Sequence, residues 1–285
     1  MRTVFINTVS AMTVAATAFT FAFAATSGTV LAADKLDVQY DLYTRGMRVF
    51  ALSYTADIDR KSFKSSATLR PKGLVSLFID LKMDMKSSGT VSPEGVQSSV
   101  FSMNIKEKRR KGIYTVNFDG LIPVSSKRDP ALKDKTEAKV NAAAAEGVRD
   151  TLASILNLSV DPEKDPCNAK YRVYNGKEVF QLAFRKIRDD VFGTDAEGVY
   201  RGPAIACSMT YSPLAGLSAR AEARFRENPL IFNVWFAPVR SSVLGRDMNV
   251  LIAASGKIKD KDFVAYASRA TLSGQPLNAK SLASR

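Results

Sequence analysis

Histidine is absent from this chain of 285 residues, which also has only two cysteines and one tryptophan. Without imidazole there is no Ser-His or Cys-His nucleophile pair, no imidazole base and no histidine-bound metal. Two cysteines are also too few for a four-cysteine zinc or iron–sulfur site. We therefore expect the chain to use no metal and no cofactor.

The motifs of several large enzyme families are missing as well. The chain has no G-x-S-x-G elbow, no S-x-x-K pair, no G-x-G-x-x-G turn and no P-loop. Paired carboxylates are the remaining acid/base option, and Asp80 and Asp84 fall on one side of a predicted strand. They alternate with Lys82 and Lys86 on a face that we expect to be solvated. The sequence thus predicts no catalytic residue and no enzymatic activity.

Residues 1–32 have the pattern of a secretory signal peptide. Arg2 is followed by an apolar stretch rich in alanine, threonine, valine and phenylalanine. Val30-Leu31-Ala32 then places small residues before a cleavage site between Ala32 and Ala33. The mature protein is therefore expected to be soluble and periplasmic.

Two alternatives concern this N-terminal segment. Cleavage after Ala24 would leave a featureless tail, so we favour the later site. An uncleaved anchor would need an uninterrupted apolar span of roughly 20 residues. The apolar run is shorter than that and contains serine and threonine, and no later stretch reaches spanning length.

Positive charge is in excess, with Lys+Arg 41 against Asp+Glu 28. In an exported protein this excess favours anionic lipid headgroups or lipopolysaccharide over nucleic acid as the partner. A cluster of cations is predicted at the tip of a hairpin: Lys106, Lys108, Arg109, Arg110 and Lys111. The simpler interpretation is a solvated hairpin tip; the functional alternative is that these cations contact an anionic membrane surface.

Cys167 and Cys207 have a simple interpretation in an oxidising compartment. An even count of two cysteines predicts one disulfide. The C-x-x-C spacing typical of redox-active pairs is absent. We therefore expect a structural bond between these two residues.

Strand patterns extend over most of the mature chain. Residues 79–86 alternate strictly between apolar and charged side chains, and alternating segments also flank the basic tip. Asn175-Gly176 suits a type I′ hairpin turn. Asp150 is a good N-cap for one short helix over residues 151–157.

At least ten strand candidates with one helix predict a mainly β fold. We expect a single antiparallel, strongly curved sheet or partial barrel. Residues 33–285 would form one β-rich domain, with an exposed Ala/Lys-rich linker near residues 125–150.

Four stretches of the sequence carry a family resemblance. They are Tyr40-Asp41-Leu42-Tyr43 with Gly46-Met47-Arg48-Val49, Asp165-Pro166-Cys167 leading to Arg172–Lys177, Gly202–Cys207, and Ile231–Val239. In this order they resemble the exported proteobacterial domain-of-unknown-function family 3108. The resemblance implies a periplasmic β-rich protein, similar to the cradles of lipoprotein carriers, with no established active site. An exported β-spiral family linked to envelope integrity fits less well, because its cysteines lie near opposite ends of the domain.

Two functions remain open from the sequence. The first is a non-enzymatic periplasmic protein that supports the cell envelope by binding a lipid or lipoprotein in the curved sheet. Met83, Met85, Phe101 and Met103 are then candidates to line the concave face. The alternative is a structural or scaffolding protein whose core is filled and which binds envelope protein partners.

Overall fold

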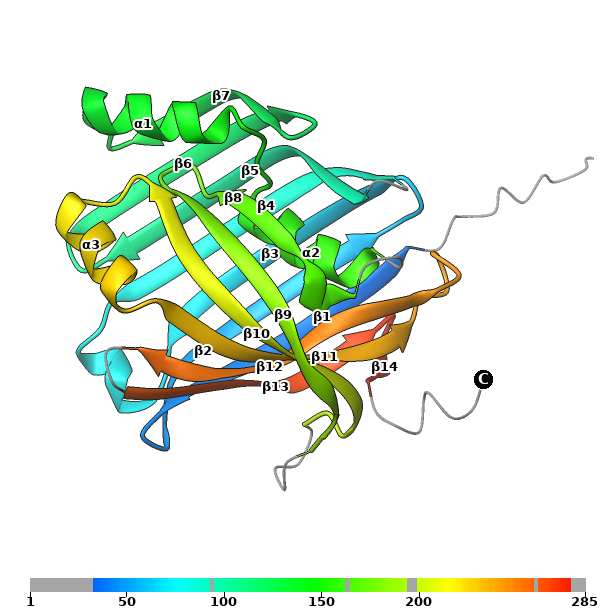
Figure 1. Cartoon of the computed structure of the whole chain (residues 1–285). Helices are drawn as coiled ribbons and strands as arrows, with labels where there is room; N and C mark the ends of the chain where they lie inside the picture. Colours follow the sequence, from blue (N-terminus) through cyan, green and yellow to red (C-terminus); the bar gives the residue numbers. More distant parts are fainter. Residues whose placement is uncertain (1–32, 93–94, 162–164, 194–198, 259–260, 278–285) are drawn as a thin grey trace, which may run out of the picture. The chain divides into compact units, whose positions relative to one another are not determined.

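One antiparallel sheet accounts for most of the described chain (Figure 1). The computed structural model describes residues 33–92, 95–161, 165–193, 199–258 and 261–277. Their strands follow the order β7-β6-β5-β4-β3-β2-β1-β13-β12-β11-β10-β9-β8, and β14 pairs with β13. The two ends of this order are not hydrogen-bonded to each other as strands, so the sheet is not a closed barrel. The predicted fold class, a single antiparallel sheet or partial barrel, is confirmed.

Consecutive strands pair with each other through both halves of the sheet. The first half contains β1 (Asp34–Thr44), β2 (Met47–Ile58), β3 (Ser62–Pro71), β4 (Leu81–Ser92), β5 (Gly95–Glu107), β6 (Arg110–Asp119) and β7 (Ile122–Asp129). The second half contains β8 (Lys170–Tyr174), β9 (Val179–Phe192), β10 (Gly202–Ala215), β11 (Leu230–Arg240), β12 (Asp247–Ile258), β13 (Lys261–Leu272) and β14 (Gln275–Pro276). The halves join where β1 pairs with β13, for example Leu36 with Leu272.

Helix α2 (Thr151–Val160) lies against the inner face of the curved sheet (Figure 1). It contacts β3, β4 and β5 of the first half and β8 and β12 of the second. Eight of its ten residues are buried, and Leu152 and Leu156 are fully buried. Because one short helix touches both halves, the sheet must curve around it.

The N-terminus of α2 is fixed by Asp150, as its sequence position predicted. The Asp150 carboxylate accepts hydrogen bonds from the backbone N–H groups of Leu152 (2.7 Å) and Ala153 (2.9 Å). These are two of the N–H groups that a helix leaves without an internal partner. The helix runs three residues further than predicted, to Val160.

The segment expected to be an exposed linker contains regular structure. Residues 125–150 include the end of β7 and the helix α1 (Asp134–Ala144), where Val140 and Ala144 are buried. The alanine run favours a helix, and Ala143 and Ala144 in it pack against the apolar cluster. A third helix, α3 (Ala219–Glu227), begins at Ser218, whose hydroxyl caps the N–H of Ala221. A single helix was predicted from the sequence. Residues 219–227 are charged and have few apolar side chains, which explains why α3 was not predicted.

A two-residue turn of type I′ needs positive φ at both of its residues. Arg45 and Gly46 both have positive φ and join β1 to β2, since Thr44 pairs with Met47. Asn175-Gly176 behaves differently, because only the glycine has positive φ. The Asn175 side chain instead accepts hydrogen bonds from the N–H groups of Lys177 and Glu178 in a longer turn. The predicted β8–β9 hairpin is present, but its turn is not type I′.

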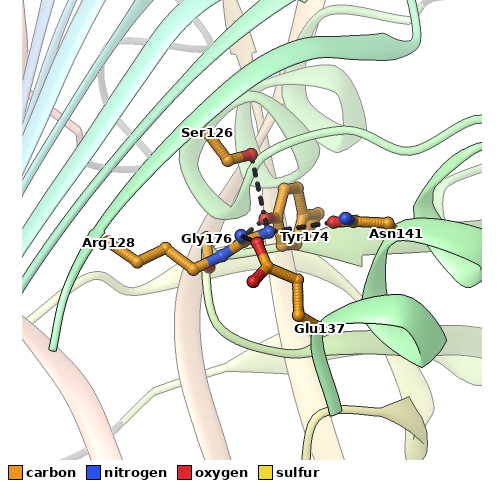
Figure 2. A network of polar contacts seen from close by, with 6 residues as sticks. All are labelled: Ser126, Arg128, Glu137, Asn141, Tyr174 and Gly176. Carbon is orange, nitrogen blue, oxygen red and sulfur yellow. Dashed lines mark hydrogen bonds and ion pairs between the residues drawn. The ribbon is translucent and has the colours of Figure 1, made fainter. Parts of the chain in front are cut away.

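The open edges of the sheet, β7 and β8, are linked by polar side chains (Figure 2). Arg128 on β7 is 5% exposed and pairs with Glu137 of α1. Its guanidinium also donates to the Tyr174 hydroxyl (2.6 Å) and the Gly176 carbonyl (2.8 Å), and to Asn141 of α1. One planar guanidinium therefore holds both edges and the covering helix together.

Candidate functional site

The five cations predicted at a hairpin tip do lie together, where β5 turns into β6 (the basic tip, Lys106–Lys111). Lys108, Arg109, Arg110 and Lys111 are exposed, and Lys106 is half-buried. The amino group of Lys106 pairs with Asp80 at 2.6 Å, and the Lys108 N–H donates to the Asp80 carbonyl. The hydrogen bond from Lys106 holds the pKa of the Asp80 carboxyl below its usual range.

An exposed apolar turn borders the basic tip, and its exposure was not predicted from the sequence. The short 3₁₀ helix η1 (Gly73–Leu77) and the residue after it expose Leu74 (75%), Leu77 (75%) and Phe78 (79%). Backbone N–H groups of Phe78 and Ile79 donate to the Val75 carbonyl, so the turn is a folded structure. We call Leu74, Leu77 and Phe78 the apolar turn.

The strand register places these features at one end of the sheet. In an antiparallel meander, alternate connections lie at the same end. The β1–β2 turn, the β3–β4 connection with η1 and the β5–β6 turn therefore share one end. The N–H of Lys72 donates to the Val49 carbonyl of β2, which ties η1 to its neighbouring strand.

Asp80 and Asp84, the two carboxylates considered as an acid/base pair, each form an ion pair with a different cation. Asp84, on β4, pairs with Arg70 at 2.6 Å and accepts a hydrogen bond from Thr68. Asp80 precedes β4 and binds Lys106. The structure does not bring the two carboxylates together into a site.

Cys167 and Cys207 form a disulfide with their Cα atoms 5.3 Å apart. Cys167 lies in η2 (Pro166–Asn168), and Cys207 lies on β10. Both sulfur-bearing side chains are fully buried in a second apolar cluster with Phe184 and Phe236. The bond therefore fastens the segment that follows α2 to the interior of the sheet.

The residues proposed to line a concave lipid site are packed in the core instead. Phe101 is fully buried and Met103 is 5% exposed, and both belong to the apolar cluster that contains Leu156. Met83 and Met85 are partly buried and pack against the same cluster. Leu152 and Leu156 of α2 belong to the same cluster, so the helix packs against this part of the inner face.

A cavity of about 550 Å³ opens at the opposite end of the sheet from the basic tip. Its walls come from the β2–β3 connection, the last residues of β4 and the β11–β12 connection. They consist of Arg60, Lys61, Val91, Ser92, Ser242, Val243, Leu244, Gly245 and Arg246. The lining combines three cations with aliphatic side chains and includes no carboxylate among the described residues. Asp34 lies just behind it and accepts a hydrogen bond from Ser242 (2.8 Å).

Asp150 is the most deeply buried carboxylate of the described chain. Besides capping α2, it accepts hydrogen bonds from Ser87 on β4 (2.6 Å) and Ser98 on β5. Burial raises the pKa of the Asp150 carboxyl, and this effect outweighs the opposite effect of its hydrogen-bond donors. The cluster positions the interior helix, and it lies too deep for a substrate to reach.

Because of Asp150, the free energy of unfolding is expected to fall as the pH rises. The unfolded chain ionises this carboxyl near pH 3.9, whereas the folded chain retains the proton to a higher pH. In that window the folded state binds more protons, so rising pH favours unfolding. Asp150→Asn mimics the neutral carboxyl and should lose this dependence. Urea unfolding of both proteins between about pH 4 and pH 8 should show the native chain losing stability relative to the variant. A constant difference across that range would mean that the donors keep Asp150 ionised.

The predicted cleavage site falls at the edge of the described residues. Ala32 lies outside them, and Ala33 is the first residue described, where it is exposed. Within the described part of the chain, each helix is too short or too polar to cross a lipid bilayer.

These observations define a mainly β protein with a curved, unclosed sheet and a disulfide of the kind typical of exported proteins. A family model described as "Protein of unknown function (DUF3108)" matches residues 39–244. The chain belongs to this family, which confirms the family predicted from its sequence stretches.

Two solved structures match the chain at low similarity. One is a beta-barrel-like protein of the domain of unknown function DUF1849 from Brucella abortus, with 8% identity and a TM-score of 0.45, covering 84% of this chain and 98% of that one. The other, from Parabacteroides distasonis, is described as a "putative lipoprotein", with 11% identity and a TM-score of 0.32, covering 83% and 94%. A comparison with curated proteins finds no significant match.

Proposed function

We propose that this chain is a non-enzymatic periplasmic protein that supports the cell envelope through contacts made on its outside. The observation that carries this proposal is the position of α2 within the curved sheet. Leu152 and Leu156 fill the concave side against the cluster that contains Phe101 and Met103. Of the two functions open from the sequence, a filled core favours the scaffold that binds envelope partners.

Binding of a lipid or lipoprotein remains the second candidate, and the cavity near Arg60 favours it. Its volume lies within the range of small-molecule sites. Arg60, Lys61 and Arg246 would face an anionic headgroup, and Val91 and Leu244 an adjoining aliphatic segment. This site would hold lipid at the end of the sheet rather than on its concave face.

Deletion of the gene tests the proposal in the host bacterium. We expect the deleted strain to become more sensitive to detergent, and the intact gene to restore resistance. Cross-linking in intact cells should then capture a specific envelope protein.

Mass spectrometry of the natively purified protein separates the two candidates. Near-stoichiometric bound lipid would contradict the scaffold and favour the carrier, and Arg60→Gln with Lys61→Gln should then lower lipid occupancy. A deleted strain with an unaltered envelope would contradict both.

A further inference from the structure

We infer that the end of the sheet formed by the apolar turn and the basic tip is a docking surface for an anionic phospholipid bilayer. The inference rests on the proposed envelope role and names one surface through which that role would be exercised. Its starting point is the exposure of three large apolar side chains in five consecutive residues. Leu74, Leu77 and Phe78 each leave three quarters or more of their surface in contact with solvent.

Exposure at this level is unusual for a folded segment, because burial would release about 25 cal/mol per Å² of apolar surface. The turn has its own internal hydrogen bonds, including one from the Ser76 hydroxyl to the Gly73 carbonyl. In a 3₁₀ helix, positions three apart lie on one side. Leu74 and Leu77 therefore project together, and Phe78 follows directly.

Charge around the apolar turn is strongly positive. Residues 45–48, 72–82 and 106–111 hold nine Lys and Arg side chains and two carboxylates. Asp80, one of the two, is bound to Lys106 and Lys82. These short segments therefore carry a large part of the net charge of +13 of the whole chain.

Apolar side chains beside cations match the chemistry of a bilayer surface. Phospholipid headgroups with net negative charge attract Lys and Arg at about 1 kcal/mol each, and apolar side chains enter the boundary of the acyl chains. Met47, the first residue of the neighbouring strand β2, is 54% exposed and adds to the apolar surface at this end. An acidic protein partner would pair with the cations, but its negative charge would not explain why three large apolar side chains protrude beside them.

Flotation with lipid vesicles tests this surface on the protein as the cell processes it. We expect binding to vesicles that contain phosphatidylglycerol, weaker binding at high salt, and little binding to pure phosphatidylcholine. The variant with Lys108→Gln, Arg109→Gln and Lys111→Gln should bind roughly a hundredfold more weakly. The variant with Leu77→Ser and Phe78→Ser should lose about tenfold or more in affinity and keep only salt-sensitive adsorption.

Matched controls come from the opposite end of the sheet. Val191, which is 80% exposed on β9, provides Val191→Ser, and Lys35→Gln with Lys64→Gln, at exposed positions near the starts of β1 and β3, provides the charge control. Both should bind within about twofold of the native protein. In a Phe78→Trp variant, the added fluorescence should shift to shorter wavelength when anionic vesicles are present. The native Trp235 signal provides the reference, since its indole stays bonded to Asp190.

Three outcomes would overturn the inference. They are no binding to anionic vesicles, equal binding by the apolar-turn variant, and a cross-linked protein that occupies Phe78 in place of lipid. The vesicles contain no other protein, so a failure to bind them would contradict membrane docking without contradicting an envelope role that acts through protein partners. That role is tested independently by the deletion strain.

Discussion

Replacing Leu156 with alanine is expected to lower the free energy of unfolding by about 3 to 5 kcal/mol. Leu156 is fully buried on the interior helix and belongs to the large apolar cluster. Removing its side chain loses the transfer free energy of three carbons and leaves a cavity among neighbours that can move only a little. Urea unfolding followed by circular dichroism measures this difference.

The same measurement on Leu74→Ala provides the matched control. This leucine is 75% exposed, so its truncation should change stability by less than about 0.5 kcal/mol. If Leu156→Ala cost less than about 1 kcal/mol, the interior would not be tightly packed. Stabilisation of the native protein by an added fatty acid would then indicate that the space around α2 takes ligand, against the scaffold.

Removal of the disulfide is the second large effect. Cys167 and Cys207 are 40 residues apart, and the double variant to serine should lose about 4 kcal/mol in the chain-entropy model. Most of this loss arises because the unfolded chain gains freedom. The two serines also place hydroxyl groups in the cluster around Phe184.

A reducing agent separates the effect of losing the disulfide from the effect of introducing two serine side chains. With a reducing agent present, the native protein should become nearly as unstable as the double variant, and the variant should not change. The described part of the chain contains no free cysteine that would complicate this comparison. A native protein unaffected by complete reduction would contradict a stabilising role for the bond.

Local patterns in the sequence predicted much of the fold. Alternation of apolar and polar side chains located most strands of the meander, because a half-buried strand imposes a period of two. Asp150 identified the start of α2, because a helix N-terminus needs a side-chain acceptor. The basic tip was found because its charges are consecutive in the sequence.

Features that depend on distant residues were not predictable in this way. The Arg128 network joins β7, α1 and the turn after β8, which no local pattern connects. The exposed state of Leu77 and Phe78 depends on how the other described elements pack around them. In the sequence alone, an apolar run such as residues 74–79 indicates a buried segment. Whether the concave face was filled depended likewise on where α2 packs.

The central position of β1 in the sheet has a consequence for how the protein is made. β1 is the first strand, but one of its two neighbours is β13, the last long strand, with Leu36 opposite Leu272. Asp34, at its start, binds serines as far along the chain as Ser241 and Ser273. The middle of the sheet cannot be completed until nearly the whole polypeptide is available, and such distant pairings form slowly. A chain with this topology stays incompletely folded while it is synthesised, which is the state in which a polypeptide can be threaded across a membrane before it folds on the other side.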